Sequence, residues 1–540
     1  MSFHESATDI TVEGNILKAQ LSNGEEYLEA EFDLDTVIGV SDGALTWGGE
    51  NFSESSEDIS FDLEGDDAVP ILRATINNED GEQTSSDINL SEFIANNCGE
   101  FEYNKTAGLT GLLICALTVA ARGLAPQAPE FGTFLSGDSK IWAAPRTITV
   151  DGKRLLAAKA ALAVGEPSTT KALASLLKDA DGWLHHGPWT VMSKNATAPT
   201  GNKHDFFVQN SYFWPSENST DGCPYLPRDG VANPEASVTD DLGLRRTLES
   251  SWALTLAWWY TGNKAYAKHA SLILKTWFLD EKTKMNPNMD YGSWLPCMEP
   301  EDNPYSFSAL IGLSSRISFV IDAICILEST NAPGWTVADT ARMTRWCKNM
   351  IKWLTTSNVG RETLLGFNNH GIYAHLAGIN MGLYVGDKSF ARELLHNVTH
   401  RIDEGITANG SQPHELIRTQ PFHYSMFTLV GFTRIILMGE KIGVDLWKYV
   451  GPEGQSVQKG IEFLIPPALN GTSVWPYPEP IHFRRAAPND IFHFAAERGS
   501  QAALNALTSC KLEQPSLGDR WPIRPAPQEL EATSILEPLD

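Results

Sequence analysis

The sequence predicts a multidomain protein in which a small all-β, pseudo-symmetric domain precedes a mainly α-helical domain of the incomplete (α/α) toroid type. Three observations predict this. The first 103 residues repeat themselves in short alternating strands, the charge changes abruptly near residue 103, and helical periodicity dominates the remainder. At 540 residues the chain is also too long for one hydrophobic core. We therefore expect domains at 1–103 and 127–540, with 104–126 as a hydrophobic linker or internal signal-like segment.

Charge is distributed very unevenly along the chain. Residues 1–103 contain 25 Asp and Glu but only two basic residues, a net charge of −23. The other 437 residues contain 42 acidic and 39 basic residues, a net charge of −3. The total of −26 argues against nucleic acid as a partner. An anionic polymer would be repelled by the first domain but not by the second.

The first domain contains two copies of one strand-rich unit. DLDTVIGVSDGALTW at 33–47 aligns with NLSEFIANNCGEFEY at 89–103, an offset of 56 residues. Short segments of alternating polarity precede each copy, as in half-buried strands, and Asp42-Gly43 is a hairpin-turn signal. The pattern resembles the cyanovirin-N homology family of lectins. The resemblance implies binding of a mannose-type oligosaccharide, and the alternative is a degenerate domain with no ligand.

Residues 106–121 form an uncharged, apolar run, TAGLTGLLICALTVAA. The run has the length of a signal-peptide core and is short for a membrane span, which needs about 20 apolar residues. Three interpretations remain open: a buried connecting helix, a signal anchor inside a natural fusion, or two neighbouring genes joined in one gene model. In both signal interpretations the second domain is extracellular. The first domain is cytosolic if two genes are joined, and a membrane is a partner only if 106–121 is an anchor.

Helical periodicity dominates the second domain. In 244–260, apolar residues recur at i, i+4 spacing, and Gly262 provides a stop signal. Further helices are predicted at 265–279, 315–328, 338–357, 372–386, 388–406 and 425–442. Consecutive antiparallel helices with short Gly and Asn turns predict an array of helical hairpins that closes partly into a toroid.

Two polar loops of this domain contain groups suited to one kind of chemistry. They hold Asn369 and His370 in NNHG, and Arg418 and Tyr424 in RTQPFHY, where Pro421 indicates a loop rather than one helical face. Removal of the C5 proton of a uronate needs donors that neutralise the carboxylate and stabilise enolate-like charge, together with a base and an acid. A tyrosine can act as the base if nearby positive charge lowers its pKa, which is about 10 when unperturbed. This chemistry needs no metal, and we expect no cofactor.

Residues from about 188 to 465 resemble the alginate lyase superfamily, whose fold is an α/α toroid. The matching pieces include PWTV, KHDFF with SYFWP, PYLPRDGVANPE, NNHG, DEGITANGSQPHELIRTQPFHYS and GVDLWKY, in sequence order. The resemblance implies a polysaccharide lyase that cleaves a polyuronate, alginate or glucuronan, by β-elimination. It assigns Asn369 and Arg418 to carboxylate neutralisation, His370 to assistance or to the base for one C5 epimer, and Tyr424 to acid or base. Relatives carry Tyr-Ala-Gln near 290–293, where this chain differs, so the uronate stays open.

Further residues are candidates for contact with the anionic polysaccharide: Lys203, His204, Tyr212, Trp214, His423 and Arg485. The rings of Tyr212 and Trp214 could stack on pyranose faces, whereas the alternative for 203–214 is a packed loop. His423 could tune Tyr424 or cap a helix, and Arg485 could contact sugar or lie on the surface. Arg418 could also form a salt bridge, for instance with Glu415.

Two other functions compete with the lyase. A glycoside hydrolase on an α/α toroid needs two carboxylates that flank the cleaved bond; Asp205, Asp229, Asp240 and Glu415 are available. A non-catalytic carbohydrate-binding protein would need none of the four catalytic candidates. Because all four are present, the sequence favours the lyase.

Overall fold

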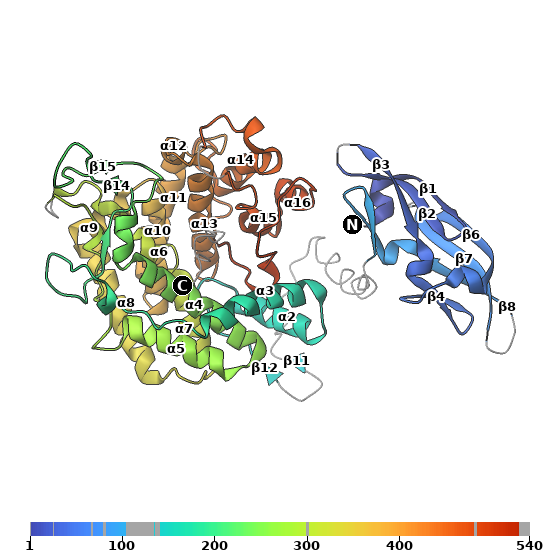
Figure 1. Cartoon of the computed structure of the whole chain (residues 1–540), viewed down its shortest axis with the longest axis horizontal. Coiled ribbons are helices and arrows are strands. Elements are labelled where there is room, and N and C mark those ends of the chain that lie inside the picture. Colours follow the sequence, from blue (N-terminus) through green and yellow to red (C-terminus); the bar gives the residue numbers. More distant parts are fainter. Residues whose placement is uncertain are drawn as a thin grey trace. The chain divides into compact units, whose positions relative to one another are not determined.

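The computed structural model describes residues 2–24, 26–65, 68–78, 83–103, 134–135, 141–298, 302–479 and 483–528. The chain divides into two compact units, Met1–Phe131 and Gly132–Asp540 (Figure 1). The predicted linker at 104–126, with its apolar run at 106–121, lies outside the described residues.

Two three-stranded antiparallel sheets make up most of the first unit. One contains β1 (Ala7–Glu13), β2 (Ile16–Ser22) and β3 (Tyr27–Asp33), and the other contains β6 (Ser56–Glu64), β7 (Val69–Asn77) and β8 (Gln83–Asn89). Two hairpins complete the unit: β4 (Ile38–Ser41) with β5 (Ala44–Trp47), and β9 (Ile94–Asn97) with β10 (Glu100–Tyr103). Buried and partly exposed residues alternate along the central strands β2 and β7. One face of each sheet therefore packs into a common core.

The internal repeat is visible residue by residue. Asp33 and Asn89, which are 56 positions apart, each accept a hydrogen bond from the backbone N–H two residues later. The turns at 42–43 and 98–99 also correspond, because both residues of each turn have positive φ, as a two-residue type I′ turn requires. The predicted pseudo-symmetric all-β unit is thus confirmed.

The second unit is mainly helical, as predicted. Its helices are α2 (Gly152–Ala163), α3 (Pro167–Trp183), α4 (Asp241–Thr261), α5 (Lys264–Phe278), α6 (Ile311–Ser314), α7 (Ile317–Ser329), α8 (Val337–Thr356), α9 (Asn358–Leu365), α10 (Asn369–Tyr384), α11 (Lys388–Gly405), α12 (Pro413–Leu416), α13 (Pro421–Glu440), α14 (Val457–Asn470), α15 (Asn489–Ala496) and α16 (Gln501–Leu507). The seven helices predicted from periodicity correspond to α4, α5, α7, α8, α10, α11 and α13.

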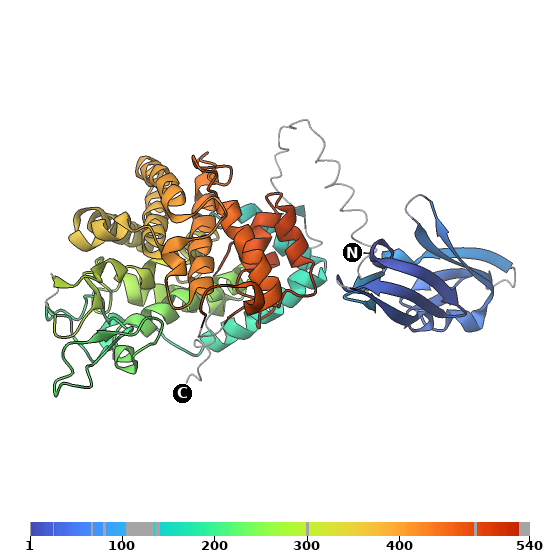
Figure 2. The ribbon, with the colours of Figure 1, turned by 90° about the horizontal axis from the view of Figure 1, so that it is seen from above.

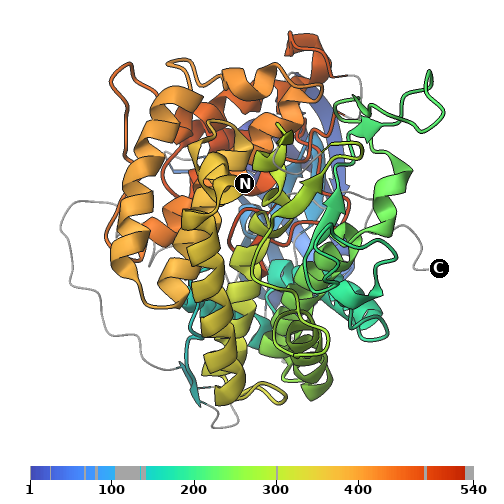
Figure 3. The same ribbon diagram turned by 90° about the vertical axis from the view of Figure 1, so that its left-hand side faces the viewer.

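Helices that follow one another in the sequence also lie side by side. α4 packs against α5, α10 against α11, and α15 against α16. In Figures 2 and 3 the colours of the helical unit accordingly progress from green through yellow to red. α10 contacts both α7 and α13, and nearly all residues of these three helices are buried. The beginning of α10 therefore has a fixed position in the unit.

The second unit contains a long loop whose two ends are tied together. It follows β13 (Phe207–Gln209), which pairs with β16 (Tyr291–Trp294), and includes the hairpin of β14 (Phe213–Trp214) and β15 (Leu226–Pro227). The backbone N–H of Asn233 donates to the backbone oxygen of Ser211 at 2.6 Å, and a disulfide joins Cys223 to Cys297 beyond β16. We call residues 210–233 the stapled loop.

Among the residues that the structure describes, one helical stretch, Ser306–Ser329, is long and apolar enough to cross a membrane. Within the unit, however, 83% of its most apolar window is buried. Core helices share this length and composition, so the stretch is weak evidence for a span.

Candidate active site

The first turn of α10 presents Asn369 and His370 from a tightly folded segment. The side chain of Asn368 caps the helix by accepting a hydrogen bond from the backbone N–H of His370. A Cβ atom added at Gly371 would lie 1.9 Å from the backbone oxygen of Gly366. Only glycine permits so close an approach of two backbone segments. The NNHG sequence therefore sets where α10 begins.

Asn369 is buried and held by a carboxylate. Its backbone N–H and its Nδ2 donate to the carboxylate of Glu415 at 2.6 and 3.0 Å. Glu415 lies on α12, is 1% exposed, and also accepts a hydrogen bond from the Thr428 hydroxyl at 2.7 Å. Burial raises the pKa of Glu415, and these donors only partly offset that effect. The orientation of Asn369 therefore depends on Glu415.

His370 lies in an apolar environment. His370 packs against Phe307 in a T-shaped arrangement, with ring centroids 5.2 Å apart. The Nδ1 atom of His370 is buried and has no hydrogen-bond partner among the described residues. Burial, and secondly the charge of Arg418, lower the pKa of His370 to about 3. The imidazole is therefore neutral near pH 7.

Arg418 connects the stapled loop to Tyr424. Its Nε and one terminal nitrogen donate to the two carboxylate oxygens of Asp229 at 3.0 and 2.7 Å, a bidentate pair. Its guanidinium carbon lies 3.8 Å from the centroid of the Tyr424 ring, as in a cation–π contact. The salt bridge considered for Arg418 is therefore made with Asp229 rather than Glu415.

We expected Tyr424 on a loop with Arg418. It lies instead in the first turn of α13. It is 7% exposed, and its hydroxyl is 3.1 Å from the hydroxyl of Tyr212 on the stapled loop. Burial raises the pKa of Tyr424, the nearby Tyr212 adds to this effect, and Arg418 only partly opposes it. The expected lowering of the pKa by positive charge is outweighed, because the phenol has lost most of its contact with water.

These contacts bring the four catalytic candidates together. Arg418 touches Tyr424 directly and acts on His370 through its charge. Asn369 joins them through Glu415, whose carboxylate interacts with Arg418 electrostatically. Tyr212 is one substrate-binding candidate that contacts this centre directly, through its hydroxyl.

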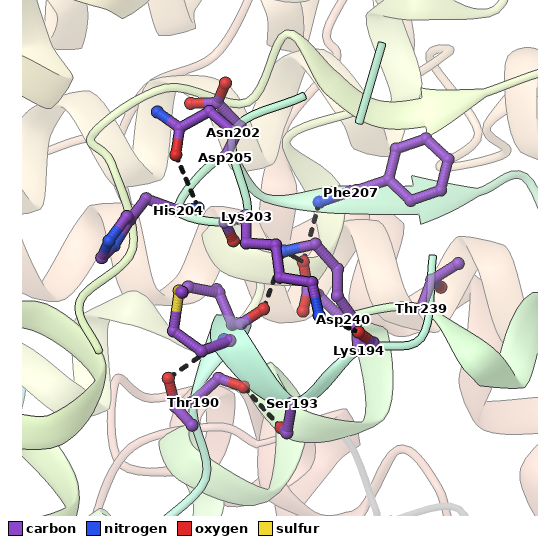
Figure 4. A network of polar contacts seen from close by, with 12 residues as sticks. Thr190, Ser193, Lys194, Asn202, Lys203, His204, Asp205, Phe207, Thr239 and Asp240 are labelled. Atoms are coloured by element: carbon purple, nitrogen blue, oxygen red, sulfur yellow. Dashed lines mark hydrogen bonds and ion pairs between the residues drawn. The ribbon is translucent and has the colours of Figure 1, made fainter. Parts of the chain in front are cut away.

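Lys203 and His204 take part in a separate network (Figure 4). The backbone oxygen of Lys203 accepts a hydrogen bond from Nζ of Lys194 at 2.7 Å, and Nδ1 of His204 donates to the backbone oxygen of Lys284 at 2.6 Å. Lys194 also forms a buried ion pair with Asp240 at 2.8 Å, and burial raises the pKa of Asp240 to about 6. These contacts hold the segment that leads into β13, and none described here joins Lys203 or His204 to the four catalytic candidates.

Trp214 is largely occupied by its own loop. Its Nε1 donates to the backbone oxygen of Val231 at 3.0 Å, and the guanidinium of Arg228 lies 4.9 Å from its ring centroid. One face of the ring is therefore covered by a cation, which leaves stacking on a sugar to the other face.

The last two candidates differ in their distance from the centre. His423 lies in the same turn of α13 as Tyr424. Its ring meets the ring of Tyr424 edge-on and stacks parallel to that of Phe427. Arg485 instead donates to the backbone oxygens of Ala468 and Leu469 at the end of α14. The carbonyl groups at this helix end thus hold the guanidinium of Arg485 in place, and its contact with sugar stays a prediction.

The sequence did not reveal that Asp229 binds Arg418 or that Glu415 binds Asn369. Asp229 lies in the matched piece PYLPRDGVANPE and Glu415 in HELIRT, so both were visible as letters. Their roles were not visible, because Asp229 and Arg418 are 189 positions apart. Within the described part of the chain, no three His, Cys, Asp or Glu side chains gather as a metal site would require.

Known proteins match the two units separately. The family model described as alginate lyase matches residues 190–475, and the model of the CVNH domain matches residues 3–102. A cyanovirin-N homolog from Neurospora crassa is 43% identical over 108 residues, which cover 19% of this chain and 97% of that protein. One from Tuber borchii is 41% identical over 68 residues, 12% of this chain and 66% of that protein. A crystal structure of an alginate lyase from Bacteroides ovatus is 28% identical with a TM-score of 0.66, and the match covers 70% of this chain and 99% of that one.

Proposed function

The chain belongs to the alginate lyase family through residues 190–475 and to the CVNH family through residues 3–102, and from this premise we propose that its helical unit cleaves a polyuronate by β-elimination. The protein is a polysaccharide lyase that carries a lectin-type domain. The observation that supports the proposal most directly is the guanidinium of Arg418 stacked on Tyr424, whose hydroxyl meets Tyr212.

Carboxylate neutralisation is the first requirement of this reaction. The C5 proton of a uronate is weakly acidic while the neighbouring carboxylate keeps its full charge, so donors must stabilise the enolate-like intermediate. Arg418 uses Nε and one terminal nitrogen for Asp229, and a guanidinium has five N–H donors in all. We assign its remaining donors, with Asn369, to the substrate carboxylate.

Proton transfer is the second requirement. Because the pKa of His370 is lowered to about 3 and that of Tyr424 is raised, His370 is a neutral imidazole and Tyr424 a protonated phenol in the unliganded enzyme. We assign His370 as the base that takes the C5 proton and Tyr424 as the acid. The C4–C5 double bond forms, the C4–O bond breaks, and the phenol protonates the leaving oxygen. Proton exchange with water then restores both groups.

The carboxylates needed by a glycoside hydrolase are engaged elsewhere. Asp229 pairs with Arg418, Glu415 holds Asn369, and Asp240 pairs with Lys194. Asp205 accepts hydrogen bonds from Thr200 and Asn286. A hydrolase would need two of them free to flank one glycosidic bond, so the contacts favour the lyase.

We further propose that the first unit binds a neutral oligosaccharide of the mannose type. Family membership supports sugar binding, and charge supports the neutral class. With a net charge of −23 over residues 1–103, this unit repels the polyanion that the second unit cleaves. The unit would thus bind the enzyme to a glycan other than its substrate.

A test of the lyase uses the complete chain and four substrates: alginate, polymannuronate, polyguluronate and glucuronan. Elimination creates an unsaturated product, so ultraviolet absorbance should rise on at least one of them. Tyr424→Phe removes the hydroxyl and should abolish the rise. The matched control is Tyr225→Phe, which removes a hydroxyl of the stapled loop that donates to Glu235 and should keep the activity. A folded protein that produces no absorbance from any of the four would overturn the assignment.

A further inference from the structure

The carboxylate of Asp229 lies in a dense set of hydrogen bonds. Besides the two from Arg418, it accepts one from the backbone N–H of Thr419 at 3.2 Å, and the Thr419 hydroxyl lies 3.2 Å from one carboxylate oxygen and 3.1 Å from the backbone oxygen of Asp229. A Cβ atom added at the next residue, Gly230, would lie 2.6 Å from the Thr419 hydroxyl. The backbone at Gly230 thus approaches the Thr419 side chain closely, which indicates a built contact rather than a chance surface pair.

This pairing fixes the plane of the guanidinium of Arg418. Two parallel hydrogen bonds from one guanidinium to one carboxylate require the two groups to be coplanar. In that plane, the guanidinium lies over Tyr424 at 3.8 Å from the ring centroid. An arginine held only by the ring could rotate and slide over it. The carboxylate of Asp229 removes that freedom.

The pairing also sets the charge beside Tyr424. Burial alone would raise the pKa of Asp229, but Arg418 and Thr419 lower it overall, so the carboxylate is ionised near pH 7. The positive charge of Arg418 favours ionisation of Tyr424, whereas the negative charge of Asp229 opposes it. The pair as a whole therefore has a weaker effect on the phenol than an isolated arginine.

On the basis of the lyase function proposed above, we propose that Asp229 is a positioning residue of the active site, which holds the guanidinium of Arg418 over the ring of Tyr424 and offsets part of its charge there. Asp229 does not need to touch the substrate. It leaves Arg418 with free donors for the substrate carboxylate but prevents it from following that carboxylate away from Tyr424. The stapled loop would thereby contribute to turnover and not only to substrate enclosure.

Steady-state kinetics of the complete chain can separate this role from simple fastening of the loop. Asp229→Asn keeps the shape of the side chain but removes its charge. An Arg418 released from its partner should bind an anionic substrate at least as well, so KM should stay level or fall. The kcat should fall about tenfold or more, since a small misplacement of catalytic groups has effects of that size. The alkaline limb of the pH profile should move to lower pH, because a charge that opposes ionisation of Tyr424 is gone.

Two companion variants complete the test. Asp229→Glu keeps the charge but displaces it, so kcat should fall while the alkaline limb stays in place; this variant also serves if Asp229→Asn does not fold. Glu217→Gln breaks the exposed pair of Glu217 with Arg228 at 3.0 Å on the same loop and should leave both parameters unchanged.

Two results would overturn the proposal. The first is an Asp229→Asn enzyme with the kcat and pH profile of the wild type. The second is a raised KM with unchanged kcat and profile, which would mean that Asp229 only fastens the loop. Failure of the lyase proposal itself would appear differently, as a wild-type enzyme without activity on any of the four polyuronates.

Discussion

Glu415 holds Asn369, one of the four catalytic candidates. Its buried carboxylate receives the backbone N–H and the side-chain amide of Asn369, together with the hydroxyl of Thr428. A buried acceptor with several donors is costly to alter, because each donor loses a partner that water cannot replace. Glu415 therefore contributes both to stability and to the placement of Asn369.

Glu415→Gln tests this double role. The NH2 group of the new glutamine would face a group that now donates to Glu415. Because two donors cannot hydrogen-bond to each other, the free energy of unfolding should fall by about 1–3 kcal/mol. Activity should fall as well, because Asn369 would lose its fixed orientation. Urea unfolding and initial rates measure the two effects. Glu393→Gln, an exposed position on α11, is the control and should change neither; equal stability of wild type and Glu415→Gln would refute the argument.

His370 should leave a signature in the pH dependence of stability. Its pKa is about 3 in the folded enzyme and near 6.5 as an ordinary histidine. Below pH 6.5 the unfolded chain therefore takes up a proton that the folded chain does not, and stability falls as the pH drops toward 3. His370→Gln lacks this effect, so its stability relative to wild type should improve as the pH is lowered from 7 to 4, measured by urea unfolding. A difference that does not vary with pH would show that the imidazole is not buried as a neutral base.

The four catalytic candidates could be identified from the sequence, because NNHG and RTQPFHY are short motifs with distinctive chemistry. The protonation of Tyr424 could not be predicted in the same way. The sequence shows an arginine six positions before it, but it shows neither the Asp229 carboxylate that offsets this arginine nor the burial that raises the pKa of the phenol. Both come from tertiary contacts.

At the scale of elements, the stapled loop supplies residues that contact the catalytic candidates at the start of α13. It brings Tyr212 to Tyr424 and Asp229 to Arg418, and the disulfide from Cys223 to Cys297 ties its middle to the segment after β16. A cross-link of this kind restricts the unfolded chain as well as the folded loop. Loss of the disulfide should therefore affect stability and catalysis together.

Replacement of both Cys223 and Cys297 by serine tests this connection. The free energy of unfolding of the lyase unit should fall by about 2–4 kcal/mol, a usual effect of removing a disulfide, and kcat/KM should fall because Tyr212 and Asp229 are held less firmly. Reducing agent should lower the activity of wild type but not of the double variant. If reduced wild type remains as active as oxidised wild type, the loop is held by its other contacts alone.

Helices with strong periodicity were predictable from the sequence, and others were not. The stripes of α4 and α5 at i, i+4 spacing give their positions to within a few residues. α14 escaped prediction, and it contains Pro466 and Pro467, residues that normally end helices. The pairing of β13 with β16 also could not be foreseen, because strands of three and four residues have too few positions to show a period.

At the scale of the whole molecule, the two units have separate hydrophobic cores and very different charges. The split in charge and the internal repeat predicted the small β unit before any contact was known. What the sequence could not supply is the placement of the functional loops on the helical array, since this depends on contacts between distant segments.

The acidity of the first unit leads to a prediction about salt. The net charge of −23 over residues 1–103 should repel a polyuronate and raise KM for the complete chain at low ionic strength. Added salt should screen this repulsion, because the Debye length is about 10 Å at 0.1 M. KM of the complete chain should therefore fall between about 0.01 and 0.1 M salt. In parallel, a neutral mannose-type oligosaccharide should bind with little dependence on salt, as calorimetry can show; a KM that only rises with salt would contradict the prediction.

The close approach of Gly371 to the oxygen of Gly366 makes glycine necessary for folding, whereas the Tyr424 hydroxyl is needed only for turnover. In a saturation library screened only for soluble, folded protein, position 371 should accept glycine alone, whereas phenylalanine at 424 should survive. Screened again for turnover, the same library should lose phenylalanine at 424. Glycine at 371 would then indicate that a related sequence keeps the fold, and tyrosine at 424 that it keeps the activity.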